Sequence, residues 1–370
     1  MIYADNAATT RLDPAALEAM LPFLKEEYAN PSQPYSFSRE SKKAIGNARE
    51  TIAGILGAEP EEIFFTSGGT ESDNWAIKGT NPAGRNHIVA GAMEHHAVLH
   101  SCEAMKRQGR EVSLVLPERD GMILPEKLKS LLREDTALVT IQLANNETGV
   151  IEPITALAEA AHEKGAIFHT DAVQAVGHIP VNVRELGVDL LSASAHKFNG
   201  PKGIGFLFRK KGTPLLPYQD GGAQERGSRA GTENVAAIVG MARALEINTG
   251  VMAETAERLR ACERVLLEAL EGTEFRYNGA ANHVPGNMSL SFRGLDGEAI
   301  LHRMDLLGVA ISTGSACTSG RTTISHVLRA MGMPEEWARG TVRISLGRFN
   351  TEEEVRTIAG HLRRIVRGAQ

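Results

Sequence analysis

A lysine stands where an apolar segment of the chain ends. Residues 192–203 read SASAHKFNGPKG, in which Lys197 follows the apolar run GVDLLSASA and precedes the apolar run GIGFLF. Both runs are typical of buried strands, so the Lys197 amine is expected at a strand end near the interior. An exposed lysine in a turn is the usual alternative for any single lysine. The other strand ends decide between these interpretations.

Asp171 and a glycine-rich segment supply further chemical groups. Asp171 follows the apolar run AIFHT, where a carboxylate could cap a helix or pair with a cation such as a protonated pyridine nitrogen. Residues 67–70 read SGGT between a predicted strand and a predicted helix, where free N–H groups favour a phosphate. The GxxxxGK[ST] spacing is absent, so this segment alone predicts no more than a helix start. An amine, a carboxylate, a phosphate cradle and ring-covering side chains together are what pyridoxal phosphate requires, which makes Lys197 a candidate for its Schiff base.

The elements that must position these groups alternate along the chain. Strand-like runs such as EIFFT, NHIVAGA, EVSLVLP, ALVTIQLA and AIFHTDAV are separated by helical patterns, which argues for a mostly parallel sheet covered by helices. Ligands bind at the carboxyl ends of the strands in such sheets. Those ends read TSGGTES, MEHHAV, ANNETG, HTDAVQ and SAHKFNG. One of them alone would be a solvated loop, but consecutive polar ends predict a site.

The C-terminal third of the chain has a different pattern. A long helical stretch from about residue 234 to 270 leads to a mixed segment that includes NMSLSF, VRISLG and TEEEVRTIAGHLRRIV. We expect an α/β protein with a large domain over residues 12–256. Residues 1–11 and 257–370 are expected to form a small domain that carries a loop at about 312–325.

Composition excludes several classes of protein. The chain has 370 residues, 42% of them hydrophobic, and a formal net charge of -5, which favours neither nucleic acid nor an anionic membrane as partner. Its three widely spaced cysteines predict neither a disulfide framework nor a metal site. No secretory signal or membrane span is visible, so the cytoplasm is the expected location.

Many motifs in one order carry a resemblance to a known family. They are DNAATT, TSGGTESDNWAIKG, EHHAVL, ANNETGV, FHTDAVQAVG, SAHKFNGPKGIG, ERGSRAGTEN, STGSACTSG, HVLRAMG and TVRISLGRF. From about residue 2 to 366 the chain resembles cysteine desulfurases of the NifS/IscS type, in the class-V aminotransferase family. The resemblance implies a fold-type I pyridoxal-phosphate homodimer that converts L-cysteine to L-alanine. It also implies a persulfide that is passed to an acceptor protein, in iron–sulfur cluster assembly or in tRNA or cofactor thiolation.

The resemblance also assigns roles to single residues. It makes Lys197 the Schiff-base lysine, Asp171 the partner of the pyridine nitrogen, and His95 the residue that stacks on the ring and assists proton transfer. Arg343 matches the residue that receives the substrate carboxylate. The other implied contacts to cofactor or substrate are Gly69, Thr70, Asn146, Gln174, Ser194, His196 and, from the other subunit, Thr232.

Cys317 is the implied sulfur carrier. It lies in STGSACTSGRTTIS, a run of small and hydroxyl residues typical of a loop that can move between substrate and acceptor. Cys102 and Cys262 lie in helical patterns, where an inert buried thiol is expected. Ser36 stands where the family commonly has a histidine, which puts the substrate contacts of that segment in doubt.

Other functions remain open from the sequence. A selenocysteine lyase would share this cofactor site and would be distinguished by a strong preference for selenocysteine. Another class-V aminotransferase-family enzyme is disfavoured by the SACTSG loop. A partner-dependent regulatory module that has lost turnover is disfavoured because Lys197, Asp171 and Cys317 are all present.

Overall fold

The large sheet of the protein is mixed but mostly parallel. The computed structural model describes residues 1–80, 82, 84–313 and 324–368, and its large sheet has the strand order β2-β8-β7-β6-β5-β3-β4. The strands from β7 to β4 run parallel, whereas β8 is antiparallel to both β7 and β2. The predicted α/β class with a mostly parallel sheet is therefore confirmed. The strands are β2 Ile63–Thr66, β3 His87–Gly91, β4 Glu111–Val115, β5 Thr136–Thr140, β6 Ile167–Asp171, β7 Leu190–Ser194 and β8 Gly205–Arg209.

Helices cover both faces of this sheet because its central strands carry apolar side chains on both sides. One face packs against α2 Arg39–Leu56, α6 Ile154–Glu163 and α8 Val235–Gly250, and the other against α3 Gly69–Gly79 and α4 His96–Arg107. Strand residues alternate between the faces: Val89, Val139, Leu191 and Phe206 belong to the first core, and Ile88, Leu138, Leu190 and Leu207 to the second. This alternation holds each strand end in a fixed place.

The helices near the N-terminus begin and end at residues that are typical of helix termini. In α2 the buried residues recur at helical spacing, and the helix ends at Gly57, whose φ of 68° is left-handed. Asp13 caps the start of α1 Pro14–Lys25, because its Oδ1 accepts the N–H of Ala15 at 2.7 Å. The other two helices of this part of the chain are shorter: α5 Pro125–Leu131 and α7 Val183–Leu186.

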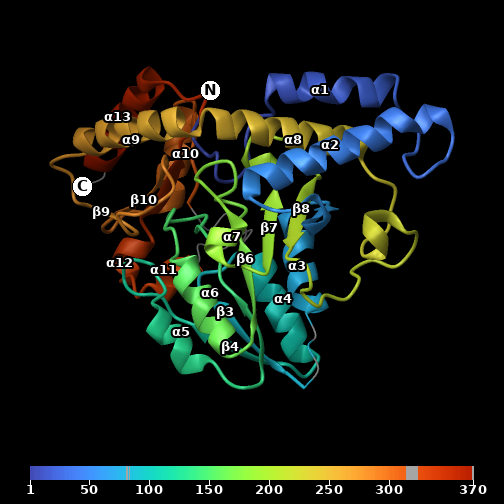
Figure 1. Cartoon of the computed structure of the whole chain (residues 1–370). Helices are drawn as coiled ribbons and strands as arrows, with labels where there is room; N and C mark the ends of the chain where they lie inside the picture. The colour runs from blue at the N-terminus through green and yellow to red at the C-terminus, as the bar shows by residue number, and fades with distance from the viewer. Residues whose placement is uncertain (81, 83, 314–323, 369–370) are drawn as a thin grey trace.

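The long helical stretch that we expected over residues 234–270 is two helices. The first, α8, ends at Gly250, and α9 Met252–Ala269 follows at an angle of 67°. Glycine favours a helix end, which accounts for the break. Figure 1 shows α8 and α9 along one side of the molecule, from α1 and α2, which pack on α8, to the group formed by the C-terminal elements. No single described helix is long and apolar enough to cross a membrane, although this bent pair passes on length and composition alone.

The C-terminal elements enclose a core of their own. It combines Ala4 with buried residues of α9 and of the elements that follow. A small antiparallel sheet has the order β12-β10-β9, and β1 pairs with β11 in parallel. The predicted boundary near residue 256 stays a prediction. The elements are β1 Ile2–Tyr3, β9 Phe275–Tyr277, β10 Asn287–Phe292, α10 Gly297–Leu306, β11 Val309–Ala310, α11 His326–Ala330, α12 Glu335–Ala338, β12 Thr341–Ser345 and α13 Glu352–Arg367.

Candidate active site

A cavity of about 570 Å³ lies at the carboxyl ends of the large sheet's parallel strands. It collects polar residues from the ends of β2, β3, β5, β6 and β7, from the N-terminal segment and from β12. The predicted site residues that line it are Gly69, Thr70, His95, Asn146, Asp171, Gln174, Ser194, His196, Lys197 and Arg343. The sequence therefore predicted the wall residues of one cavity from segments far apart in the chain.

Lys197 lies one turn beyond the end of β7. The chain passes from Ser194 into a short 3-10 turn, η3 Ala195–Lys197, which follows directly from the strand. Lys197 Nζ donates hydrogen bonds to the main-chain oxygens of Ala7 at 2.6 Å and Ala8 at 2.9 Å. Carbonyl oxygens hold the amine without neutralising it, so the lysine is placed for chemistry at the cavity wall.

Asp171 is the carboxylate of this cavity. It is the last residue of β6 and is 7% exposed, and its Oδ1 accepts the N–H of Val173 at 2.9 Å. Burial raises the pKa of Asp171 to about 6, and the N–H bond and the Lys197 charge oppose that rise. Asp171 is therefore ionised at neutral pH and becomes protonated in mild acid.

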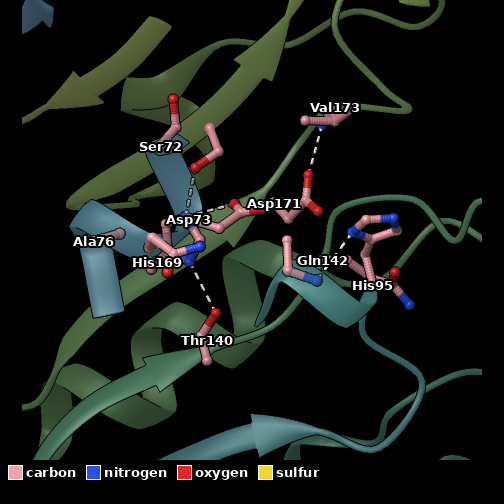
Figure 2. A network of polar contacts seen from close by, with 12 residues as sticks. Ser72, Asp73, Ala76, His95, Thr140, Gln142, His169, Asp171 and Val173 are labelled. Atoms are coloured by element: carbon pink, nitrogen blue, oxygen red, sulfur yellow. Dashed lines mark hydrogen bonds and ion pairs between the residues drawn. The ribbon is translucent and has the colours of Figure 1, made fainter. Parts of the chain in front are cut away.

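A second carboxyl group behind Asp171 was missed by our reading of the sequence. Asp73 lies on α3, and Figure 2 shows it next to His169 and Asp171. Its Oδ1 is 3.7 Å from His169 Nε2, which also contacts Ser192 Oγ at 2.9 Å. Burial, and then the Asp171 charge, raise the pKa of Asp73 well above its usual range, and burial lowers the pKa of His169 to about 3.

These shifts give the cavity floor one negative charge. Two adjacent buried carboxyl groups do not both ionise, and the neutral imidazole of His169 offers Asp73 no cation. Asp73 therefore carries the proton and Asp171 the charge. The signal that could have found Asp73 is its position three residues after Thr70, on the buried side of a predicted helix.

The N-terminus of α3 forms one end of the cavity. Its first N–H groups have no partners within the helix, and Gly68, the residue before it, provides no side-chain cap. A Cβ atom at Gly69 would lie 2.6 Å from Val173 Cγ2, and one at Gly205 would lie 2.7 Å from the Gly68 Cα. The glycines thus let this turn approach the sheet closely and leave its N–H groups open to a bound anion.

Further polar groups surround this helix start. Ser194 and His196 line the cavity, as does Lys202, a cation that we did not predict. His196 Nδ1 is 3.1 Å from Thr9 Oγ1. Burial and the two lysine charges lower the pKa of His196 to about 4, so its ring is neutral at pH 7. The set suits a phosphate group, with Lys202 as the cation.

His95 precedes α4 and caps it. Its Nδ1 accepts the N–H of Ala97 at 3.1 Å, so the neutral ring carries its proton on Nε2. Burial, and then the charge of Lys197, lower the pKa of His95 to about 4. At neutral pH His95 is therefore able to accept or donate one proton at the cavity wall.

Arg343 and Asn146 lie together in the cavity. Arg343, on β12, is 4% exposed, and its Nη1 donates to the Asn146 main-chain oxygen at 2.9 Å. Its Nη2 contacts Asp5 Oδ1 at 2.6 Å. A guanidinium in this place can grip a carboxylate.

Two predicted residues are not placed in this cavity. Thr232 lines a neighbouring cavity of about 150 Å³ with Ser67 and Arg229. Cys317 lies outside the described residues. The structure describes the two ends of the predicted loop, Ser312 and Ser325. Ser312 exchanges main-chain hydrogen bonds with Arg343, and Ser325 Oγ donates to Glu147 Oε2 at 2.5 Å. The N-terminal end of the predicted loop is therefore held against Arg343, and its C-terminal end contacts Glu147, the residue after Asn146.

The donor set fits pyridoxal phosphate. The Lys197 amine suits its carbonyl carbon, and the buried carboxylate of Asp171 suits its ring nitrogen. The helix start, with Ser194, His196 and Lys202 beside it, suits its phosphate. The close approach at Gly69 leaves room where any other residue would place a side chain.

Comparisons with known proteins agree with this site. Residues 2–358 match the family described as "Aminotransferase class-V". The chain is 48% identical to "Cysteine desulfurase IscS" of Dictyoglomus turgidum, over 99% of this chain and 94% of the relative. A solved structure titled "NIFS-LIKE PROTEIN" superimposes with a TM-score of 0.94 at 38% identity, over 99% of each chain. Another, titled "SspA in complex with cysteine", does so with a TM-score of 0.84 at 34% identity, over 95% of this chain and 100% of that one. The fold expected from the resemblance is confirmed, and the chain belongs to the class-V aminotransferase family.

Proposed function

We propose that this protein is a pyridoxal-phosphate-dependent cysteine desulfurase. It removes sulfur from L-cysteine, releases L-alanine and carries the sulfur on Cys317 to an acceptor protein. The observation that carries the proposal is one cavity that contains the Lys197 amine, the buried carboxyl group of Asp171 and the buried Arg343 guanidinium. The name of the relative from Dictyoglomus turgidum supports the same activity, and the SspA title supports cysteine as the substrate.

The chain's residues would hold the cofactor at three points. Lys197 would bond to its carbonyl carbon, Asp171 would pair with its ring nitrogen, and the start of α3 would bind its phosphate. When bound, pyridoxal phosphate takes up the electrons that a substrate releases as it loses its α-proton. Gln174 and Asn146 would contact the ring oxygen, and His95 would cover the ring face.

Other residues would hold and deprotonate the substrate. Arg343 would bind its carboxylate, as the planar guanidinium matches two oxygens at once. Lys197 would also be the base that takes the proton from the substrate α-carbon. His95 is neutral at pH 7 and so can move a proton in the steps before and after carbon–sulfur cleavage.

Cys317 would perform the sulfur transfer. Its thiolate attacks the substrate sulfur, forming a sulfur–sulfur bond and breaking the carbon–sulfur bond. The electron pair of the broken bond stays with the three-carbon fragment, which is protonated and leaves as alanine. The main-chain hydrogen bonds between Ser312 and Arg343 support delivery of Cys317 to this cavity.

A homodimer is part of the proposal. Thr232 lines a separate cavity and not the main one, so within one chain it does not complete the phosphate site. We propose that Thr232 of a second copy does so, as the family resemblance implies.

The pH dependence of cofactor binding tests the role of Asp171. Because burial raises its pKa to about 6, Asp171 loses its charge as the pH falls through that value, and the attraction for a protonated ring nitrogen is lost. We expect the dissociation constant for pyridoxal phosphate, measured by fluorescence titration of the cofactor-free protein, to rise by about tenfold per pH unit below about 6. The Asp171→Asn variant should bind weakly and lack this transition. A wild-type profile that is flat between pH 7 and 5 would refute the assignment.

The activity itself is tested with the cofactor-loaded protein, L-cysteine and a reducing thiol. The expected products are alanine and sulfide in equal amounts. Neither product, with cofactor bound, would contradict the proposal. A parallel assay with L-selenocysteine addresses the alternative, since a strong preference for it would indicate a selenocysteine lyase.

A further inference from the structure

Arg343 is already engaged by a carboxylate of its own chain. Its Nη2 donates to Asp5 Oδ1 at 2.6 Å. Its Nε has no hydrogen-bond partner among the described residues, although the side chain is 4% exposed. Nε and Nη2 form one edge of the guanidinium, and that edge can grip both oxygens of a single carboxylate. Asp5 therefore satisfies only half of it.

The Asp5 side chain can leave Arg343 without unfolding the segment around it. Its main-chain oxygen accepts hydrogen bonds from Tyr3 Oη at 2.9 Å and from the N–H of Ala8 at 3.0 Å. Asp5 also forms a main-chain bridge with Ser345. These contacts hold the backbone independently of the carboxylate, which is 19% exposed and so can be solvated on release.

The same segment contacts other groups of the site. Ala7 accepts hydrogen bonds through its main-chain oxygen from Lys197 Nζ and from Gln174 Nε2. Asp5 is thus part of a strap, residues 5–10, that lies along the cavity and contacts the residues assigned to cofactor and substrate.

We propose that Asp5 is a specificity-determining positioning residue that occupies Arg343 until a substrate carboxylate displaces it. This inference rests on the proposed function, because it assumes that Arg343 receives the carboxylate of an α-amino acid. A substrate carboxylate can accept hydrogen bonds from both Nε and Nη2 of Arg343, whereas Asp5 accepts only from Nη2. Replacement of Asp5 by the substrate carboxylate is therefore favourable. Asp5 also competes with the product carboxylate, which promotes release of alanine.

Removing the charge of Asp5 should therefore tighten binding of carboxylates. In Asp5→Asn the amide oxygen can still accept from Nη2, but the competing negative charge is gone. We expect the dissociation constant of L-alanine to fall roughly tenfold, because residue 5 loses the charge that strengthens its hydrogen bond to Arg343 and so competes less well with the alanine carboxylate. The KM for L-cysteine should fall in parallel, with no increase in kcat.

The experiment is calorimetric titration of the cofactor-loaded protein with L-alanine and, as a carboxylate-free control, with L-alanine methyl ester. The matched control variant is Asp305→Asn, which removes the same charge from an exposed position on α10. Asp5→Asn should bind alanine more tightly and the ester unchanged, and Asp305→Asn should resemble the wild type. If Asp5→Asn does not accumulate as folded protein, Asp5→Ser serves the same test.

Two results would overturn the inference. One is alanine binding that is unchanged or weaker in the Asp5 variants. The other is an equal gain for the methyl ester, which would show an effect unrelated to the carboxylate. The titration requires no turnover, so a wild-type protein that forms no alanine from cysteine refutes the proposed function separately. Normal turnover with unchanged alanine binding refutes the Asp5 role alone.

Discussion

A Lys197→Ala variant is expected to lose the covalently attached cofactor and nearly all alanine formation. Lys197 is assigned two tasks, the bond to the cofactor and the removal of the substrate α-proton, and no other lysine amine is hydrogen-bonded to the Ala7 and Ala8 oxygens among the described residues. Loss of a positioned base alone costs about 10²–10⁴-fold in rate, so the combined loss should reach at least about 10⁴-fold. Rates are measured as alanine formed from L-cysteine, and attachment as mass after borohydride reduction.

Lys202→Ala is the matched control for this prediction. Lys202 lines the same cavity and carries the same charge, but we assign it only to the phosphate. This variant should keep the covalent attachment and bind the cofactor more weakly, with activity recovered at high cofactor concentration. Covalent attachment that survives in Lys197→Ala, or disappears in Lys202→Ala, would contradict the assignment.

A Cys317→Ala variant should keep the cofactor and lose sulfur transfer. Without a thiolate to accept the sulfur, the carbon–sulfur bond is not broken by this route, and sulfide release should fall by at least about 10³-fold. The visible spectrum of the bound cofactor should be unchanged, because Cys317 is not assigned to its binding. The persulfide is detected by mass spectrometry of the protein after incubation with L-cysteine.

The other two cysteines supply the controls. Cys102 and Cys262 are each 2% exposed, and burial raises the pKa of Cys102 to about 12, so it is a thiol at neutral pH. Cys102→Ala and Cys262→Ala should therefore retain the wild-type rate of sulfide release. Full sulfide release by Cys317→Ala, or a persulfide on Cys102 or Cys262, would exclude Cys317 as the carrier.

The sequence alone predicted which strand ends line the cavity. Lys197 and Asp171 each follow an apolar run, and such a run must be buried, so the polar residue after it must lie at a sheet edge. In a mostly parallel sheet these edges coincide, which is why local patterns far apart in the chain predicted the wall of one cavity. The motif order then identified the family, and the comparisons confirmed it.

The sequence did not reveal how the charges of the site are distributed. In the sequence, Asp73 is an ordinary acidic residue of a predicted helix. Its pKa is raised by burial beside Asp171, and that burial results from the packing of the helix against the sheet. His169 is likewise neutral because it is enclosed between Thr140 and Ser192 on neighbouring strands. Desolvation is set by all surrounding atoms, and no local pattern encodes it.

Contacts across the whole chain were also decided only by the tertiary structure. Asp5 and Arg343 are 338 positions apart, and their pairing requires that the N-terminal segment and β12 meet at the cavity. The motif DNAATT identified a family but contained no indication that its aspartate would occupy the arginine assigned to the substrate. The sequence predicted which residues line the cavity, whereas their charges and partners followed from burial and long-range packing, which a linear pattern does not contain.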